Sequence, residues 1–174
     1  MAESELKSAY QAFRAWMFDE ALPFWATTRD GPGLGFVEHL TLQGAPDPVS
    51  FKRMRLQARQ IYVFSHAEIL GWPGGREIAR AGFDFIRQHG WREAGGWARR
   101  LGREGGVEDA TADLYDNATV LFGLAWYARA AGDPEATEWA NRTVTWVRQA
   151  MAAPHGGFWN TLPPGAEPRQ QNPH

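Results

Sequence analysis

The sequence contains no cysteine, and this absence narrows the ways in which a chain of 174 residues can be stabilised and can act. Without cysteine there is neither a disulfide framework nor a thiolate-ligated metal site. The sequence also lacks a His-x-x-x-His or Glu-x-x-His pair, a GxSxG motif, a P-loop and a GxGxxG fingerprint. We therefore expect a chain with an ordinary hydrophobic core, no metal and no cofactor.

An excess of one charge and a long apolar run are also missing. The chain has 18 basic and 20 acidic residues, so binding to the phosphate backbone of a nucleic acid is not expected. No run reaches the roughly 18 apolar residues that a membrane-spanning helix needs. The N-terminal segment MAESELKSAYQAFRAW has no apolar secretory region. We expect a cytoplasmic protein without a nucleic-acid or membrane partner.

Glycine and aromatic residues are abundant, and three Gly-aromatic pairs are evenly spaced. Gly35-Phe36, Gly96-Trp97 and Gly157-Phe158 begin at positions 35, 96 and 157, so both intervals are 61 residues. Each pair lies in a glycine-rich stretch that predicts a β-hairpin-like loop. Equal spacing over so long a period is typical of a repeat protein.

Helical patterns fill the segments between these loops. They span about residues 4–21, 50–70, 75–89, 113–131 and 134–151. The second and fourth are apolar almost all round, which is typical of helices buried on both sides, and the others are amphipathic. Ser50 and Asp113 are the expected caps of the two buried helices. This alternation of outer and inner helices predicts an all-α toroid.

The last Gly-aromatic loop precedes Asn172-Pro173-His174, where a third inner helix should begin. We therefore expect residues 1–174 to form the N-terminal part of a single toroid domain that is truncated before its third inner helix. Inner helices without neighbours would expose apolar surface, so we also expect self-association through them.

Polar residues form a stripe on the second helix. Arg55, Arg59, Tyr62 and His66 are spaced at i, i+4, i+7 and i+11, which places them on one helical face. One interpretation is a buried ion-pair network or a solvated edge, because a buried charge without a partner is costly. The other, which we favour, is that the stripe lines the hollow of the toroid and contacts a polar ligand.

The fourth helix opens with the polar sequence DLYDN, residues 113–117. Asp113 is the expected helix cap, and Asp116 is placed one turn on to pair with Arg55 or Arg59. Tyr115 and Asn117 are expected to reach the hollow, with Trp97, Phe158 or Trp159 as aromatic walls. Cations, hydroxyl and amide groups and aromatic faces together suit a sugar.

The segments RMRLQARQIYVFSHAEILG, DLYDNATVLFGLAWYARAAGD and GGFWNTLPPGAEPRQQNPH resemble the N-acylglucosamine 2-epimerase superfamily. The resemblance covers most of the chain in the same order. It implies an (α/α)6 barrel, of which this chain matches the N-terminal half. The fold expected here is thus a partial (α/α)6 barrel of about two and a half helix pairs with β-hairpin-like loops.

The resemblance also implies roles for individual residues. The Arg of the Q-[AG]-R element, which contacts substrate, matches Arg59, and the pocket-facing Tyr of D-L-Y-[DG] matches Tyr115. Asn172 and His174 match the Asn and the first His of an N-P-H-M-H element. The two histidines that act as general acid and base lie in the family's C-terminal half, which this chain does not match, so we expect the isolated chain to be inactive. His66 is the one candidate base on the stripe, and we expect it to support the site instead.

The function implied is a sugar aldose–ketose isomerase or 2-epimerase that removes the C2 proton of a monosaccharide or sugar phosphate. A mannose-type isomerase is favoured because QARQIYVFSHA resembles bacterial isomerases. The alternatives are an N-acylglucosamine 2-epimerase, a glycoside hydrolase or hydratase using Asp113 and Asp116, and a non-catalytic fragment.

Overall fold

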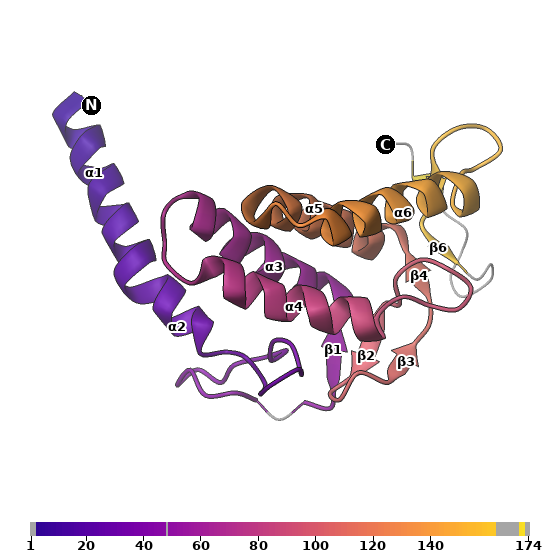
Figure 1. Ribbon diagram of the computed structural model, residues 1–174, viewed down its shortest axis with the longest axis horizontal. Coiled ribbons are helices and arrows are strands. Elements are labelled where there is room, and N and C mark those ends of the chain that lie inside the picture. Colours follow the sequence, from indigo (N-terminus) through magenta and orange to yellow (C-terminus); the bar gives the residue numbers. More distant parts are fainter. Residues whose placement is uncertain (1–2, 48, 163–170, 173–174) are drawn as a thin grey trace.

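The computed structural model describes residues 3–47, 49–162 and 171–172, in which helices dominate (Figure 1). The helices are α1 (Glu3–Trp16), the π-helical turn η1 (Met17–Ala21), α2 (Leu22–Ala26), α3 (Met54–Ile69), α4 (Gly75–His89), α5 (Leu114–Ala131) and α6 (Pro134–Ala150). The strands are β1 (Phe51–Arg53), β2 (Arg100–Gly102), β3 (Val107–Asp109), β4 (Ala112–Asp113), β5 (Phe158–Trp159), β6 (Thr161–Leu162) and β7 (Gln171–Asn172).

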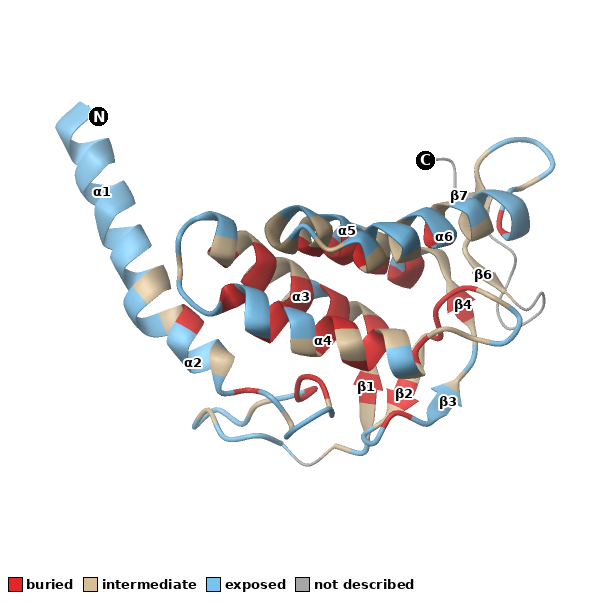
Figure 2. Cartoon of the chain, in the orientation of Figure 1, coloured by how far each residue is buried: buried red, intermediate tan, exposed pale blue. Residues whose placement is uncertain are grey.

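Two helical hairpins, α3–α4 and α5–α6, lie side by side, and α3 and α5 are their inner members. Helix α3 packs against both α4 and α5, and α5 packs against α6 (Figure 1). Buried residues gather on the sides of these helices that face one another (Figure 2), and many of them are apolar. They include Ile61, Phe64, Phe83, Ile86, Leu124 and Tyr127. The predicted alternation of inner and outer helices is confirmed for these two hairpins.

The three Gly-aromatic turns share one backbone geometry, as the equal spacing predicts. The glycine before each aromatic residue has a positive φ, 67° at Gly35, 74° at Gly96 and 72° at Gly157. The carbonyl of each glycine accepts a hydrogen bond of 2.9 to 3.0 Å from a residue four or five positions earlier, namely Asp30, Arg92 and Ala153. Each turn is therefore the same small hairpin-like loop.

The strands join one repeat to the next. Strand β1, just before α3, pairs antiparallel with β2 of the second loop, and β4, just before α5, pairs with β6 of the third loop. This pairing corrects the predicted start of the second helix. Residues 51–53 are extended, and α3 begins at Met54 rather than after a Ser50 cap, because the backbone of β1 bonds to β2. Asp113 is the predicted cap of α5, since its Oδ1 accepts from the Asp116 N–H at 3.0 Å.

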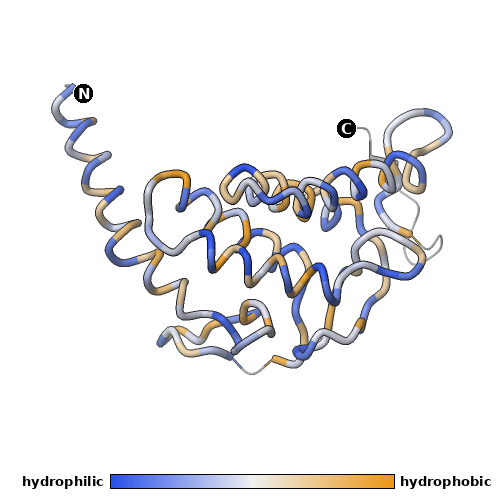
Figure 3. The backbone as a smooth tube through the Cα atoms, viewed as in Figure 1, coloured by the Kyte–Doolittle hydropathy of each residue, from blue (hydrophilic) through white to orange (hydrophobic). Residues whose placement is uncertain are grey.

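Helix α1 extends away from the two hairpins (Figure 1). The helix predicted over residues 4–21 is observed as α1 followed by η1, and none of the α1 residues is buried (Figure 2). Its large apolar side chains are 50 to 62% exposed, at Leu6, Tyr10, Phe13 and Trp16. Apolar and polar positions alternate along it at helical spacing (Figure 3). Helix α1 thus has an apolar stripe that the described residues leave open.

The inner helices also expose apolar surface, as predicted. Tyr115 and Phe122 of α5 are 54% and 49% exposed. Among the described helices, none has the length and apolar character required to cross a membrane. The predicted start of a third inner helix lies mostly outside the described residues: Asn172 belongs to strand β7, which pairs with β5, and His174 is not described.

Candidate functional site

An arginine and a tyrosine from the two inner helices meet at the end of the α3–α5 pair that lies nearer the strands. Arg59 Nη2 donates a hydrogen bond of 2.6 Å to the Tyr115 hydroxyl, and both side chains are exposed. Nearby arginines are paired with carboxylates: Arg53 with Glu38, Arg55 with Asp116, and Arg99 with Asp113. No described carboxylate pairs with Arg59. Its positive charge is therefore available to an oxygen-rich ligand.

An aromatic surface continues from this point along both helices. The Tyr62 ring lies 4.6 Å from that of Phe122, and the His66 ring lies 4.4 Å from that of Trp126, measured between centroids. The Tyr62 hydroxyl is 3.2 Å from His66 Nδ1. The order of contacts, from Arg59–Tyr115 to His66–Trp126, is the same along α3 and α5, so the two helices run parallel. Aromatic faces of this kind suit the apolar faces of sugar rings.

Asp116 and Arg55 form the ion pair that the sequence suggests. Arg55 Nε lies 3.2 Å from Asp116 Oδ1, and the Asp116 side chain is fully buried. Burial, and then the nearby Asp113 carboxylate, raise the pKa of Asp116 from 3.8 to about 6 although Arg55, Arg99 and Arg53 lower it. The Asp113 carboxylate caps α5 through Oδ1 and accepts a hydrogen bond from Arg99 through Oδ2. These two carboxylates therefore do not flank an open cleft as the hydrolase alternative requires.

Trp97 lies in the core rather than on an open wall, and Asn117 lies there rather than in the hollow. Both are fully buried, the Trp97 N–H donates to Asn117 Oδ1 at 2.9 Å, and the Trp97 indole donates to Thr143 at 2.9 Å. The equivalent turn is held in the same way, since the Phe36 N–H donates to Gln57 Oε1 at 2.8 Å. Sequence reasoning missed Gln57, although its interval of 60 residues from Asn117 follows the repeat.

The remaining predicted residues lie at the third loop. Phe158 and Trp159 form strand β5 and are half-buried. The backbone of Asn172 pairs with that of Phe158, and His174 lies outside the described residues. The structure therefore brings Arg55, Arg59, Tyr115 and Asp116 together, and it places Tyr62 and His66 beside them on the same helical face. The roles of Asn172 and His174 stay predictions.

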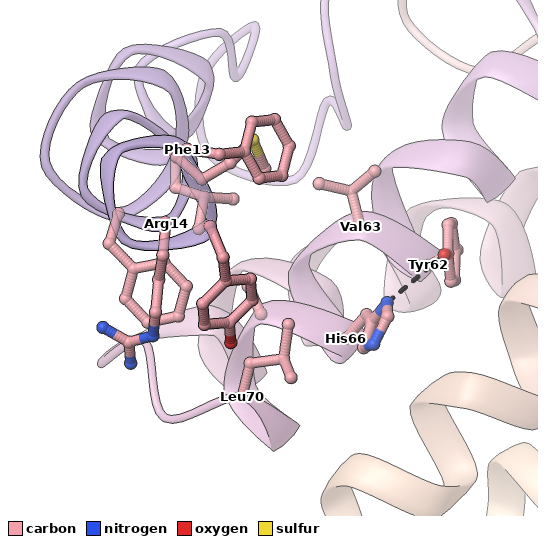
Figure 4. A pocket seen from close by; sticks show the side chains of 11 residues that line it. Phe13, Arg14, Tyr62, Val63, His66 and Leu70 are labelled. Atoms are coloured by element: carbon pink, nitrogen blue, oxygen red, sulfur yellow. Dashed lines mark hydrogen bonds between the residues drawn. The ribbon is translucent and has the colours of Figure 1, made fainter. Parts of the chain in front are cut away.

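An apolar groove lies between α1 and the end of α3 that is farther from the strands (Figure 4). Its volume is about 400 Å³, and Phe13, Arg14, Val63 and Leu70 are among the side chains around it. Tyr62 and His66 form its edge toward the aromatic surface described above (Figure 4). Because most of its lining is apolar, this groove suits the apolar side chains of another protein segment.

Comparison with known proteins gives consistent matches over most of the chain. The family model described as N-acylglucosamine 2-epimerase matches residues 35–174. The chain is 34% identical over 164 residues to a mannose-6-phosphate isomerase of Rhizobium meliloti (strain 1021), an alignment that covers 91% of this chain and 42% of that relative. It is 30% identical over 128 residues to a cellobiose 2-epimerase of Ruminococcus albus, with 71% of this chain and 32% of the relative covered.

A solved structure shows the same arrangement of helices. The cellobiose 2-epimerase of Spirochaeta thermophila DSM 6192 superimposes with a TM-score of 0.86 and 27% identity, over 91% of this chain and 40% of that chain. The chain thus spans less than half the length of the relatives it matches. The expected all-α fold, a partial (α/α)6 barrel, is confirmed. The chain belongs to the N-acylglucosamine 2-epimerase family.

Proposed function

We propose that this chain is the substrate-binding part of a sugar aldose–ketose isomerase or 2-epimerase, with a mannose-type isomerase favoured. The observation that carries the proposal is the exposed Arg59–Tyr115 pair, which has a 2.6 Å hydrogen bond and no carboxylate to neutralise Arg59 among the described residues. Two of the relatives, a mannose-6-phosphate isomerase and a cellobiose 2-epimerase, support the same class of chemistry.

The reaction requires a cation beside a developing oxyanion. Removing the C2 proton of an open-chain sugar leaves negative charge on the carbonyl oxygen, and an enediolate forms. The Arg59 guanidinium and the Tyr115 hydroxyl are hydrogen-bond donors that stabilise this charge. Return of the proton to C1, with transfer of the O2 hydroxyl proton to O1, gives the ketose isomer, whereas its return to the opposite face of C2 gives the epimer. The geometry of Arg59 and Tyr115 serves both outcomes.

His66 is poorly placed to take the C2 proton of a sugar held by Arg59. The two residues are seven positions apart on α3, which corresponds to roughly 10 Å along the helix axis. A general base must lie within hydrogen-bond reach of the proton it removes. His66 is also engaged by Tyr62 and by the ring of Trp126. We propose that it supports the aromatic surface and that another residue of the complete barrel supplies the base.

We further propose that the isolated chain is inactive and self-associates. Helix α1 and the apolar groove of about 400 Å³ expose surface that further helices of the barrel would cover. Sedimentation velocity tests this directly. A concentration-dependent shift to larger species supports the proposal, and a monomer at all concentrations contradicts it.

The catalytic proposal is tested by exchange at C2. D-Mannose is incubated in D2O with the chain joined to the C-terminal half of a related isomerase, and proton NMR follows the C2 signal. We expect loss of that signal, with fructose as product for an isomerase and glucose for a 2-epimerase. Arg59→Met should abolish exchange, and Arg87→Met, on the outer helix α4, should not. Release of reducing ends from an oligosaccharide without exchange would instead support a hydrolase.

A further inference from the structure

Asp116 lies in the first turn of α5 and is fully buried, although the neighbouring Tyr115 is exposed. Neither carboxylate oxygen of Asp116 accepts a hydrogen bond of ordinary geometry from the residues that the structure describes. Buried polar groups nearly always have such partners. Its contact with Arg55 Nε, at 3.2 Å, meets the distance of an ion pair but not the direction of a hydrogen bond. The interaction between them is therefore one of charge.

Arg55 connects this buried carboxylate to the candidate site. The central carbon of its guanidinium lies 5.9 Å from the centroid of the Tyr115 ring, and that of Arg59 lies 5.8 Å from the same ring. One tyrosine thus has two cations beside it, within the range of a cation–π interaction. Because Arg55 and Arg59 are one turn apart on α3, their charges repel each other.

The negative charge of Asp116, 3.2 Å from Arg55 Nε, offsets this repulsion. Arg55 faces it, whereas Arg59 bonds to the Tyr115 hydroxyl. The two arginines therefore differ in what they can do: one is neutralised and fixed, and the other keeps its charge. Without the carboxylate, both guanidinium groups would compete for the Tyr115 ring and move apart.

We propose that Asp116 and Arg55 are positioning residues that hold the Tyr115 ring and thereby keep Arg59 aimed at a sugar oxygen. This proposal rests on the proposed function, because it assigns a role to residues behind the same site. Neither residue is required to touch the sugar. Their effect is on the affinity of the site and on the orientation of Tyr115.

The surroundings of Asp116 make this arrangement sensitive to pH. The charged groups that face it are Arg55 of α3, Arg53 of β1, Arg99 of the second loop, and Asp113 at the end of β4. Burial and Asp113 raise the pKa of Asp116 to about 6, so its carboxylate is mostly charged at pH 7.5 and mostly neutral at pH 5. Protonation removes the charge that fixes Arg55.

The first experiment measures the Tyr115 ring directly, without any sugar. Carbon-13 labelled tyrosine is followed by NMR between pH 7.5 and pH 5 in the chain and in Asp116→Asn. We expect the Tyr115 signals to shift with a midpoint near pH 6, and the shift should be absent in Asp116→Asn and present in His66→Gln. If Asp116→Asn does not fold, Arg55→Gln must abolish the shift in its place. A Tyr115 signal that does not change with pH, or a shift that persists in Asp116→Asn and Arg55→Gln, overturns the positioning role.

The second experiment measures mannose affinity by NMR titration of the same chain. We expect the affinity to be severalfold lower at pH 5 than at pH 7.5, because protonation of Asp116 removes the charge that fixes Arg55. Asp116→Asn should bind weakly at both values, and Glu135→Gln, which removes an outer ion pair, should behave as the wild type does. A Tyr115 shift without any mannose binding would contradict the proposed function and leave the positioning pair supported. Equal binding by Asp116→Asn and the wild type would overturn the pair.

Discussion

The buried amine of Lys52 gives a sharp test of how the first two loops are held together. Lys52 is 1% exposed in β1, and its Nζ donates to Asp30 Oδ2 at 2.8 Å and to the Phe36 carbonyl at 2.9 Å. Arg103 donates twice to the same carboxylate, at 2.8 and 2.6 Å. Burial alone would raise the pKa of Asp30, but the hydrogen bonds from Arg103 and Lys52 bring it below the ordinary value. The carboxylate therefore depends on both cations.

We expect Lys52→Met to lower the free energy of unfolding by about 3 kcal/mol. Breaking a buried ion pair costs roughly 3–5 kcal/mol when one charge is left without a partner. The lower end of this energy range applies because Arg103 still pairs with Asp30 after the substitution. The Phe36 carbonyl also keeps a donor, Gln57 Nε2 at 2.9 Å. Methionine preserves most of the aliphatic packing of Lys52, so the decrease in the free energy of unfolding measures the contribution of the amine.

Urea unfolding followed by tryptophan fluorescence measures this change. Arg87→Met is the matched control, because it removes a cation from partly exposed ion pairs with Asp84 and Glu135 and should cost less than about 0.5 kcal/mol. Adding Asp30→Asn to Lys52→Met should recover part of the loss, since no buried anion then remains. A loss below about 1 kcal/mol for Lys52→Met would refute the argument that a buried charge is at stake.

Three further outcomes are expected. Burial raises the pKa of Asp116 from 3.8 to about 6. The protonated side chain therefore contributes to the free energy of unfolding below about pH 3.8, and this contribution is lost as the pH rises through about 6. The stability of Asp116→Asn relative to wild type should therefore improve by about 3 kcal/mol between roughly pH 4 and pH 7 in urea titrations. Gly35→Ala should destabilise the chain more than Gly33→Ala in the same assay. Both positions have positive φ, but only at Gly35 does a Cβ meet atoms at 2.6 Å, so equal losses would contradict the steric argument. Asn117→Ala should cost about 2 kcal/mol because it leaves the Trp97 N–H buried without an acceptor, and thermal unfolding would show an unchanged Tm if this is wrong.

The sequence predicted the elements that depend on periodicity. Helices α4 and α6 and the body of α5 follow from apolar spacing and from the glycine and proline residues that bound them. The turns at Gly35, Gly96 and Gly157 follow from a repeat that is visible without any structure. The pairing of Asp116 with Arg55 was also foreseeable, because a buried helix leaves an acidic residue few partners.

What could not be predicted depends on contacts distant in sequence. The start of α3 moved from position 50 to Met54 because β1 pairs with β2, and no local signal marks a strand of three residues. The sequence predicts Trp97 as an aromatic wall and Asn117 in the hollow, because residue type alone does not show which way a side chain in a loop or in a first helical turn points. The structure shows that both are enclosed, as is Gln57 in the preceding repeat.

The strand pairs between repeats constrain how this chain can vary in length. In β1 and β2, Lys52 faces Leu101 and Arg53 faces Arg100, with the first pair enclosed and the second at the surface. Deleting one residue within either strand would shift the alignment by one place and turn charged guanidinium groups inward. Evolutionary insertions and deletions should therefore accumulate outside β1 and β2, because a change there leaves the alignment of the two strands intact.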